Sequence, residues 1–131
     1  MKILLYLLNF VQKDIHTEEI KLMVGNRKAE LISHSILKHI TASILVKEGH
    51  KCGIEIEFFG LGIVDVIDWT DGIVYEIQPK KNRSAEADKV KRYTSNAEVK
   101  DVIFIYYRDY PLNMTVSTLY KKLKRKLVGE E

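Results

Sequence analysis

The sequence is poor in residues that make covalent or rigid structure, with one cysteine, two prolines and one tryptophan among 131 residues. Because Cys52 is alone, the chain can form neither an internal disulfide nor a metal site made only of cysteines. This composition fits a reducing, intracellular setting, so we expect a cytoplasmic protein.

Long apolar runs are also missing. The run Ile3–Leu8 near the start is too short to cross a bilayer and has no small-residue cleavage site after it. We interpret it as buried structure, either helix or strand, with a signal peptide as the alternative, and we expect no membrane partner.

Two kinds of catalytic motif are absent as well. The chain has no glycine loop of the kind that cradles phosphates, and its four histidines lack metalloprotease spacing. We interpret His34 as a polar helix residue. No repeat or linker divides the chain, so its 46% hydrophobic and 30% charged residues predict one globular domain over residues 1–131.

The most informative stretch that is present runs from Gly62 to Lys81. It predicts two apolar strands joined by a tight turn at Asp71-Gly72, both of which tolerate positive φ. Asp65 and Glu76 lie within these strands. An isolated buried carboxylate costs several kcal/mol, so two of them on adjacent strands favour a shared cation.

The alternation of side chains assigns faces to these strands. We expect Ile63, Asp65 and Ile67 on one face of the first strand, and Val64, Val66 and Asp68 on the other. In the second strand, Val74, Glu76 and Gln78 share a face. Asp68 is expected to hydrogen-bond near the end of its strand.

Hydrophobic periodicity predicts the remaining elements. They are a helix start at Thr17, a helix from about Asn26 to Lys47, a half-exposed strand His50–Phe59, a helix capped by Ser84 and ending near Ser95, a strand Val102–Tyr107 and a helix Val116–Leu127. The last strand is expected to pair with the strand of Glu76 through a right-handed crossover. The predicted fold is α/β, with a central mixed sheet of about four strands flanked by helices.

A third acid belongs to the predicted helix that begins at Asn26. Glu30 lies on the apolar stripe of Met23, Leu37 and Ile44, either at its solvent end or as a third carboxylate of the strand site. Such oxygen ligands suit Mg²⁺ or Mn²⁺, which activate water for attack on phosphorus. Gln78 is placed to orient that water, and Lys80 to supply positive charge.

Basic residues follow the acidic strands. Lys81, Arg83, Lys89 and Arg92 indicate a surface for DNA phosphates, and Tyr93 is either core or a nucleic-acid contact. The basic segment Lys121–Lys126 is either a solvated helix face or a surface for an acidic partner.

The order of a helix with Glu30, a strand with Asp65 and a strand with Glu76-Ile77-Gln78 resembles the PD-(D/E)XK nuclease superfamily. The resemblance implies an α-β-β-β-α-β restriction-endonuclease-like core. It also implies that Asp65 and Glu76 are metal ligands and that Ile77 is a main-chain carbonyl ligand.

Two further segments are similar to particular branches of that superfamily. Arg27-Lys28-Ala29-Glu30 resembles the helix of archaeal Holliday-junction resolvases, in which an Arg precedes the accessory Glu. Residues 89–93 resemble the Gln-x-x-x-Tyr motif of RecB-like nucleases. Gln78 departs from the Lys of most members, and Lys89 departs from the Gln of the second motif.

These features predict a Mg²⁺-dependent deoxyribonuclease, and a homodimer if the substrate is duplex or junction DNA. Two alternatives stay open. One is a non-catalytic nucleic-acid-binding or assembly module that keeps the nuclease fold, as Gln78 permits. The other is a scaffold that binds an acidic partner through its last helix.

Overall fold

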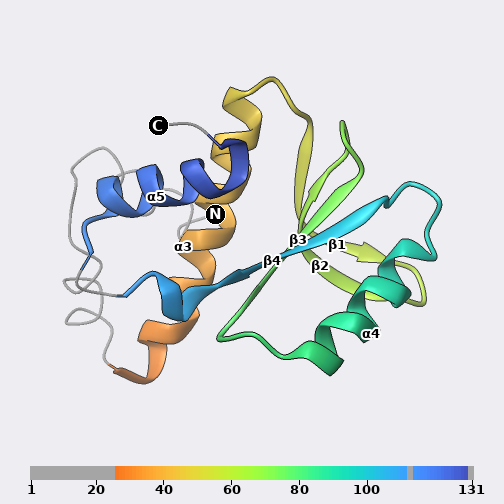
Figure 1. The fold of residues 1–131 in the computed structure, drawn as a ribbon, viewed down its shortest axis with the longest axis horizontal. Helices are drawn as coiled ribbons and strands as arrows, with labels where there is room; N and C mark the ends of the chain where they lie inside the picture. Colours follow the sequence, from red (N-terminus) through yellow and green to blue (C-terminus); the bar gives the residue numbers. More distant parts are fainter. Residues whose placement is uncertain (1–25, 112–113, 130–131) are drawn as a thin grey trace.

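The computed structural model describes residues 26–111 and 114–129, with side chains from residue 33 onward. Its elements in chain order are α3 (Asn26–Lys47), β1 (Cys52–Phe58), β2 (Gly62–Asp68), β3 (Ile73–Gln78), α4 (Arg83–Thr94), β4 (Asp101–Tyr106), the 3-10 turn η1 (Tyr107–Asp109) and α5 (Val116–Val128) (Figure 1). The predicted order of helix, three strands, helix, strand and helix is confirmed. The helix start expected at Thr17 lies outside the described residues.

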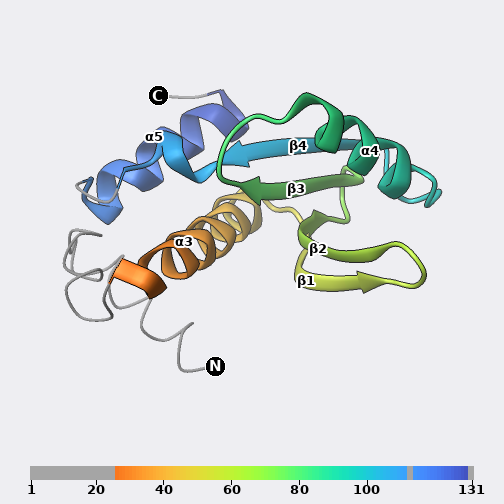
Figure 2. The same ribbon diagram turned by 90° about the horizontal axis from the view of Figure 1, so that it is seen from below.

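The four strands form one mixed sheet in the order β1-β2-β3-β4. β2 pairs antiparallel with both β1 and β3, and β4 pairs parallel with β3. Helix α4 lies on one face of the sheet and α3 on the other, with α5 beyond the ends of β3 and β4 (Figure 2). The predicted α/β class with a four-stranded mixed sheet is therefore confirmed.

Each face of the sheet carries its own core. The first core joins α3 and α5 to Val66, Tyr75, Ile77 and Ile105. The second lies under α4 and contains Val64, Ile67, Val74 and Tyr93 among its residues. Since β2 and β3 contribute to both cores, they are buried on both faces from Val64 onward, as their sequences predict, whereas Gly62 and Ile63 at the start of β2 are exposed.

The expected alternation is wrong in one half of β2. Val64 belongs to the second core and Val66 to the first, although strict alternation places them together. On β1, Ile54 packs against the first core and Ile56 against the second. The change of face coincides with Glu55 on β1, whose φ of 54° is the only positive value of a non-glycine residue in the described part of the chain.

Two local details also differ from the sequence-based expectations. The β2–β3 hairpin has a four-residue loop from Trp69 to Gly72, in which Gly72 has positive φ and Asp71 does not. Gly72 donates its amide to the carbonyl of Asp68 at 2.8 Å. Helix α4 is capped by Asn82 instead of Ser84, because the Asn82 side chain accepts the Ala85 amide.

No helix among the described residues is both long enough and apolar enough to cross a membrane.

Candidate metal centre

The β2–β3 ladder ends at Val66 and Tyr75, one residue before the two predicted ligands. Beyond that point the carboxylates hold the strands together. Glu76 Oε2 accepts the main-chain amide of Asp65 at 2.9 Å, and Asp65 Oδ2 accepts the amide of Ile77 at 2.7 Å. The structure therefore brings Asp65 and Glu76 together where the β1–β2 pair diverges from the β3–β4 pair (Figure 2).

Both carboxylates are largely withdrawn from solvent, with 18% of the Asp65 side chain and 6% of the Glu76 side chain exposed. Burial, the strongest single influence, pushes the pKa of Asp65 upward, but hydrogen bonds from His34 and the Ile77 amide outweigh it and hold that pKa below its usual value. Burial and then the charge of Asp65 raise the pKa of Glu76. The two acids thus have opposite tendencies to ionise.

Helix α3 contributes two basic side chains on the Asp65 side of the site. His34 Nε2 lies 3.4 Å from Asp65 Oδ2. One turn later, the Lys38 ammonium is buried and lies 2.6 Å from Glu55 Oε2. Glu55 faces Asp65 across the β1–β2 ladder, between the pairs Ile54–Val66 and Ile56–Val64. Its unusual backbone conformation therefore coincides with the candidate site, where strain is often functional.

Helix α4 reaches the site from the other face. Lys89 Nζ lies 3.3 Å from Glu76 Oε1. Gln78 instead turns toward the start of α4, where its amide donates to Glu86 Oε2 at 2.7 Å and to the Lys80 carbonyl at 3.2 Å. Glu86 in turn accepts the Asn82 amide, so Gln78 helps to fix the cap of α4.

The other predicted site residues are distributed around this centre. Lys80, Lys81 and Arg83 are exposed around the start of α4. The guanidinium of Arg92 lies 5.1 Å from the centre of the Tyr93 ring. That ring is 3% exposed and packs edge-on against Phe58, which leaves it no free face on which a base can stack.

Arg27 and Glu30 lie in α3 by their backbone, but their side chains lie outside the described part of the structure. Glu30 precedes His34 by one helical turn, which is the spacing of neighbours on one helix face. The role of the Ile77 carbonyl as a ligand stays a prediction, since only its amide contacts Asp65.

The sequence-based reasoning missed His34, Lys38, Glu55 and Lys89 as members of the Asp65–Glu76 environment. A signal for the two residues of α3, His34 and Lys38, was available. Glu30, His34 and Lys38 are spaced by four residues, so they follow one another along one face of α3. No comparable local pattern marks Glu55.

A second cluster of possible ligands lies at the opposite end of β2. Among the described residues, one group of three His, Cys, Asp or Glu residues has its possible ligand atoms within 4.8 Å of one another. It consists of His50, Asp68 and Asp71. His50 Nδ1 donates to Asp68 Oδ2 at 2.6 Å, and Asp68 Oδ1 accepts the amides of Thr70 and Asp71. These bonds confirm the expected hydrogen-bonding role of Asp68.

The donor set at Asp65 and Glu76 fits a small hard cation. Both residues offer carboxylate oxygens from adjacent strands, and Mg²⁺ is commonly held by one or two carboxylates together with water and phosphate oxygens. No protein-family model, curated protein or solved structure matches the chain. Functional inference therefore rests on the geometry of these residues.

Proposed function

We propose that the protein is a Mg²⁺- or Mn²⁺-dependent deoxyribonuclease with a PD-(D/E)XK, restriction-endonuclease-like core. The observation that carries the proposal is the reciprocal bonding of Asp65 and Glu76, which gathers two shielded carboxylates where β2 and β3 part. The element order α3-β1-β2-β3-α4-β4 supports the fold assignment.

In this proposal Asp65 and Glu76 hold the cation, with Glu30 as the third carboxylate from α3. A bound Mg²⁺ supplies a polarised phosphate oxygen and a water of lowered pKa. Asp65 is ready to bind in its ionised form because its pKa is depressed. Glu76 gives up its proton less readily, so cation binding at this residue is coupled to proton release.

The positive group that faces the reacting phosphate is Lys89 in this arrangement. Its ammonium already lies against Glu76, whereas Lys80 is exposed and no contact joins it to either carboxylate in the described structure. With a cation held at Glu76, Lys89 would be free to donate to a phosphate oxygen, where charge grows in the transition state. Gln78 supports this role indirectly by fixing the start of α4.

The exposed basic residues Lys80, Lys81 and Arg83 then contact phosphates that flank the reacting one. One such centre cuts one strand, so we propose a homodimer on duplex or junction DNA.

The second candidate is a DNA-binding module with the same fold and no cleavage. The observation that favours it is the Gln78 amide, which bonds to Glu86 and the Lys80 carbonyl and to neither carboxylate oxygen of the pair. This candidate predicts salt-sensitive DNA binding without metal-dependent cutting.

A cleavage assay separates the two candidates. Purified protein is incubated with supercoiled plasmid, single-stranded DNA and a four-way junction, in Mg²⁺, Mn²⁺ or EDTA. The nuclease predicts cutting that requires the cation and is abolished in Asp65→Asn and Glu76→Gln. Cutting that persists in both variants contradicts the proposed site, and binding without cutting favours the second candidate.

A further inference from the structure

A pocket with three cationic side chains lies between η1 and α5, away from the carboxylate pair. It has a volume of about 510 Å³ and is lined by Asp109, Tyr110, Lys122, Arg125 and Lys126. All of these residues except Tyr110 are exposed, so the pocket opens to solvent. Its lining suits an anion with several oxygens more than an apolar ligand.

The spacing of the three cations places them on one side of α5. Lys122, Arg125 and Lys126 follow the i, i+3, i+4 pattern, while Val116, Leu119 and Leu123 face the core. No carboxylate lies within ion-pair distance of these three residues in the part of the chain that the structure describes. Their charges are therefore available to an external ligand.

One of the cations is held in place before any ligand arrives. Lys122 Nζ donates to the main-chain carbonyl of Asp109 at 2.5 Å and lies 4.8 Å from the centre of the Tyr110 ring. The ring is buried, so it forms a fixed support for the ammonium. An ammonium has three donors, which leaves two for a ligand. Pre-organisation of this kind lowers the entropic cost of binding.

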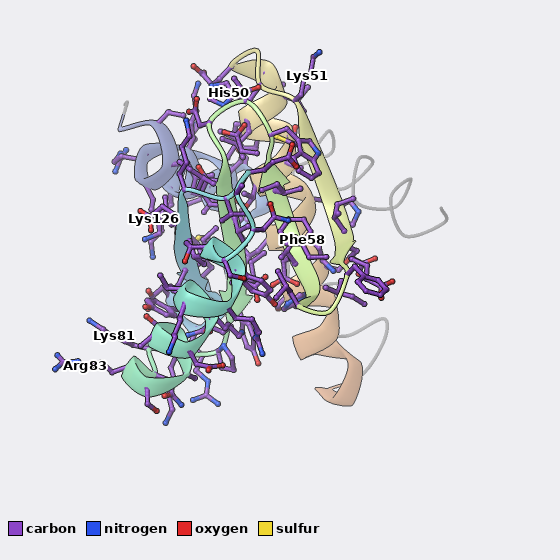
Figure 3. All side chains as sticks on the ribbon, turned by 90° about the vertical axis from the view of Figure 1, so that its right-hand side faces the viewer. His50, Lys51, Phe58, Lys81, Arg83 and Lys126 are labelled. Carbon is purple, nitrogen blue, oxygen red and sulfur yellow. The ribbon has the colours of Figure 1, made fainter. Side chains whose placement is uncertain are left out.

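The pocket is connected to the surface already proposed to contact DNA. The amide of Arg108, in η1, donates to the carbonyl of Pro79 at 3.2 Å, and Pro79 is followed directly by Lys80 and Lys81. Figure 3 shows Lys126 on the same side of the molecule as Lys81 and Arg83, with Lys51 on the other side. The 3-10 turn that contributes to the pocket therefore contacts the segment that leads into α4.

We propose that this pocket binds the phosphate backbone of DNA as a second contact, separate from the phosphate at the carboxylate pair. The choice of DNA as the polyanion rests on the proposed function. The last helix then has a specific role in substrate binding through Lys122, Arg125 and Lys126, and its remaining lysines are solvated.

The test compares two double variants of α5 that remove the same charge. Arg125→Gln/Lys126→Gln removes pocket cations, and Lys121→Gln/Lys124→Gln removes cations of the same helix that do not line the pocket. Binding of a fluorescent DNA duplex is measured by anisotropy in EDTA over a range of salt concentrations. Circular dichroism melting checks that both variants remain folded.

The pocket variant is expected to bind more weakly and to reduce the slope of log K against log salt by about 2, since each lost phosphate contact contributes about 0.9. The control variant should keep most of the wild-type slope.

The variant Asp109→Asn is expected to bind DNA several-fold more tightly than wild type, because it removes a negative charge from the pocket wall.

Equal losses in the two double variants would overturn the proposal, because they would indicate unspecific attraction to the whole helix. The proposal would also be overturned if the pocket variant bound DNA as tightly as wild type but lost binding to polyglutamate. That result would indicate an acidic protein partner. Since the assay contains EDTA, it is independent of cleavage. Pocket-dependent binding by a protein that never cuts DNA would refute the nuclease and leave the pocket assignment intact.

Discussion

The main-chain amide of Asp65 donates to the side-chain carboxylate of Glu76 across 2.9 Å, at a point where ordinary pairing between β2 and β3 has ended. In the opposite direction, the Asp65 carboxylate accepts a hydrogen bond from the amide of Ile77, which lies in the same strand as Glu76. Each acid therefore supports the sheet as well as the candidate site. Substitutions that keep the acceptor but remove the charge separate these two roles.

The structural role predicts different stabilities for two variants of Asp65. Asp65→Ala leaves the Ile77 amide without its acceptor and should lower the free energy of unfolding by about 1–3 kcal/mol. Asp65→Asn keeps an oxygen at that position and should stay closer to wild type. Urea unfolding in EDTA measures both values, and equal stabilities of the two variants would show that this bond does not support the sheet.

The raised pKa of Glu76 predicts that Glu76→Gln increases the free energy of unfolding of the metal-free protein, and that the increase depends on pH. A carboxyl whose folded-state pKa is raised favours the folded state below its unfolded pKa, and this contribution is lost as pH rises through the folded value. The variant should therefore match wild type near pH 4 and be the more stable protein at pH 7.5. Urea unfolding at the two pH values tests this, and a variant that is less stable at pH 7.5 would contradict it.

The contact of Lys89 with Glu76 predicts that this lysine matters more for cleavage than Gln78 does. Lys89→Met should lower kcat by about 10²-fold, the scale seen when one charge-stabilising donor is removed from an active site. Gln78→Met should reduce kcat less than tenfold and mainly lower the melting temperature, because it loosens the cap of α4. Single-turnover cleavage rates with Mg²⁺ provide the comparison, and the opposite ranking would assign the catalytic role to Gln78.

The backbone at Glu55 predicts an unusual ranking of two substitutions. Both Glu55→Gln and Glu55→Gly remove the charge that pairs with the buried Lys38 ammonium. Only glycine also accepts a φ of 54° without strain, so Glu55→Gly should be the more stable of the two by roughly 1 kcal/mol. Thermal unfolding of the two proteins checks the ranking, and a less stable glycine variant would mean that the conformation costs little.

Much of the fold follows from patterns that are local in the sequence. The apolar strands around Asp65 and Glu76 and the apolar faces of the helices are read from periodicity, and the order of elements in the described residues agrees. Local rules do not determine the position of a helix cap when two nearby residues are equally good caps. Asn82 and Ser84 are both good helix caps, and the chain uses Asn82 because its neighbour Glu86 also closes the reciprocal bond to the Asn82 amide.

Other features depend on contacts between distant segments. The change of face along β1 and β2 coincides with the positive φ of Glu55, and no sequence rule assigns a left-handed conformation to a glutamate within a strand. Lys89 comes close to Glu76 because α4 lies on one face of the sheet, and His34 meets Asp65 because α3 packs on the other. The sequence thus indicated the pair of acids and the helices on either side, while the contacts that His34 and Lys89 make with these acids became evident only in three dimensions.

A calorimetric titration of Mn²⁺ tests the central claim most directly. Wild-type protein should bind the ion with a heat signal that is lost in Asp65→Asn and in Glu76→Gln. Asp71→Asn, which alters the other cluster of possible ligands, should leave that signal unchanged. Binding that survives in Asp65→Asn and disappears in Asp71→Asn would contradict the assignment and move the metal site to the far end of β2.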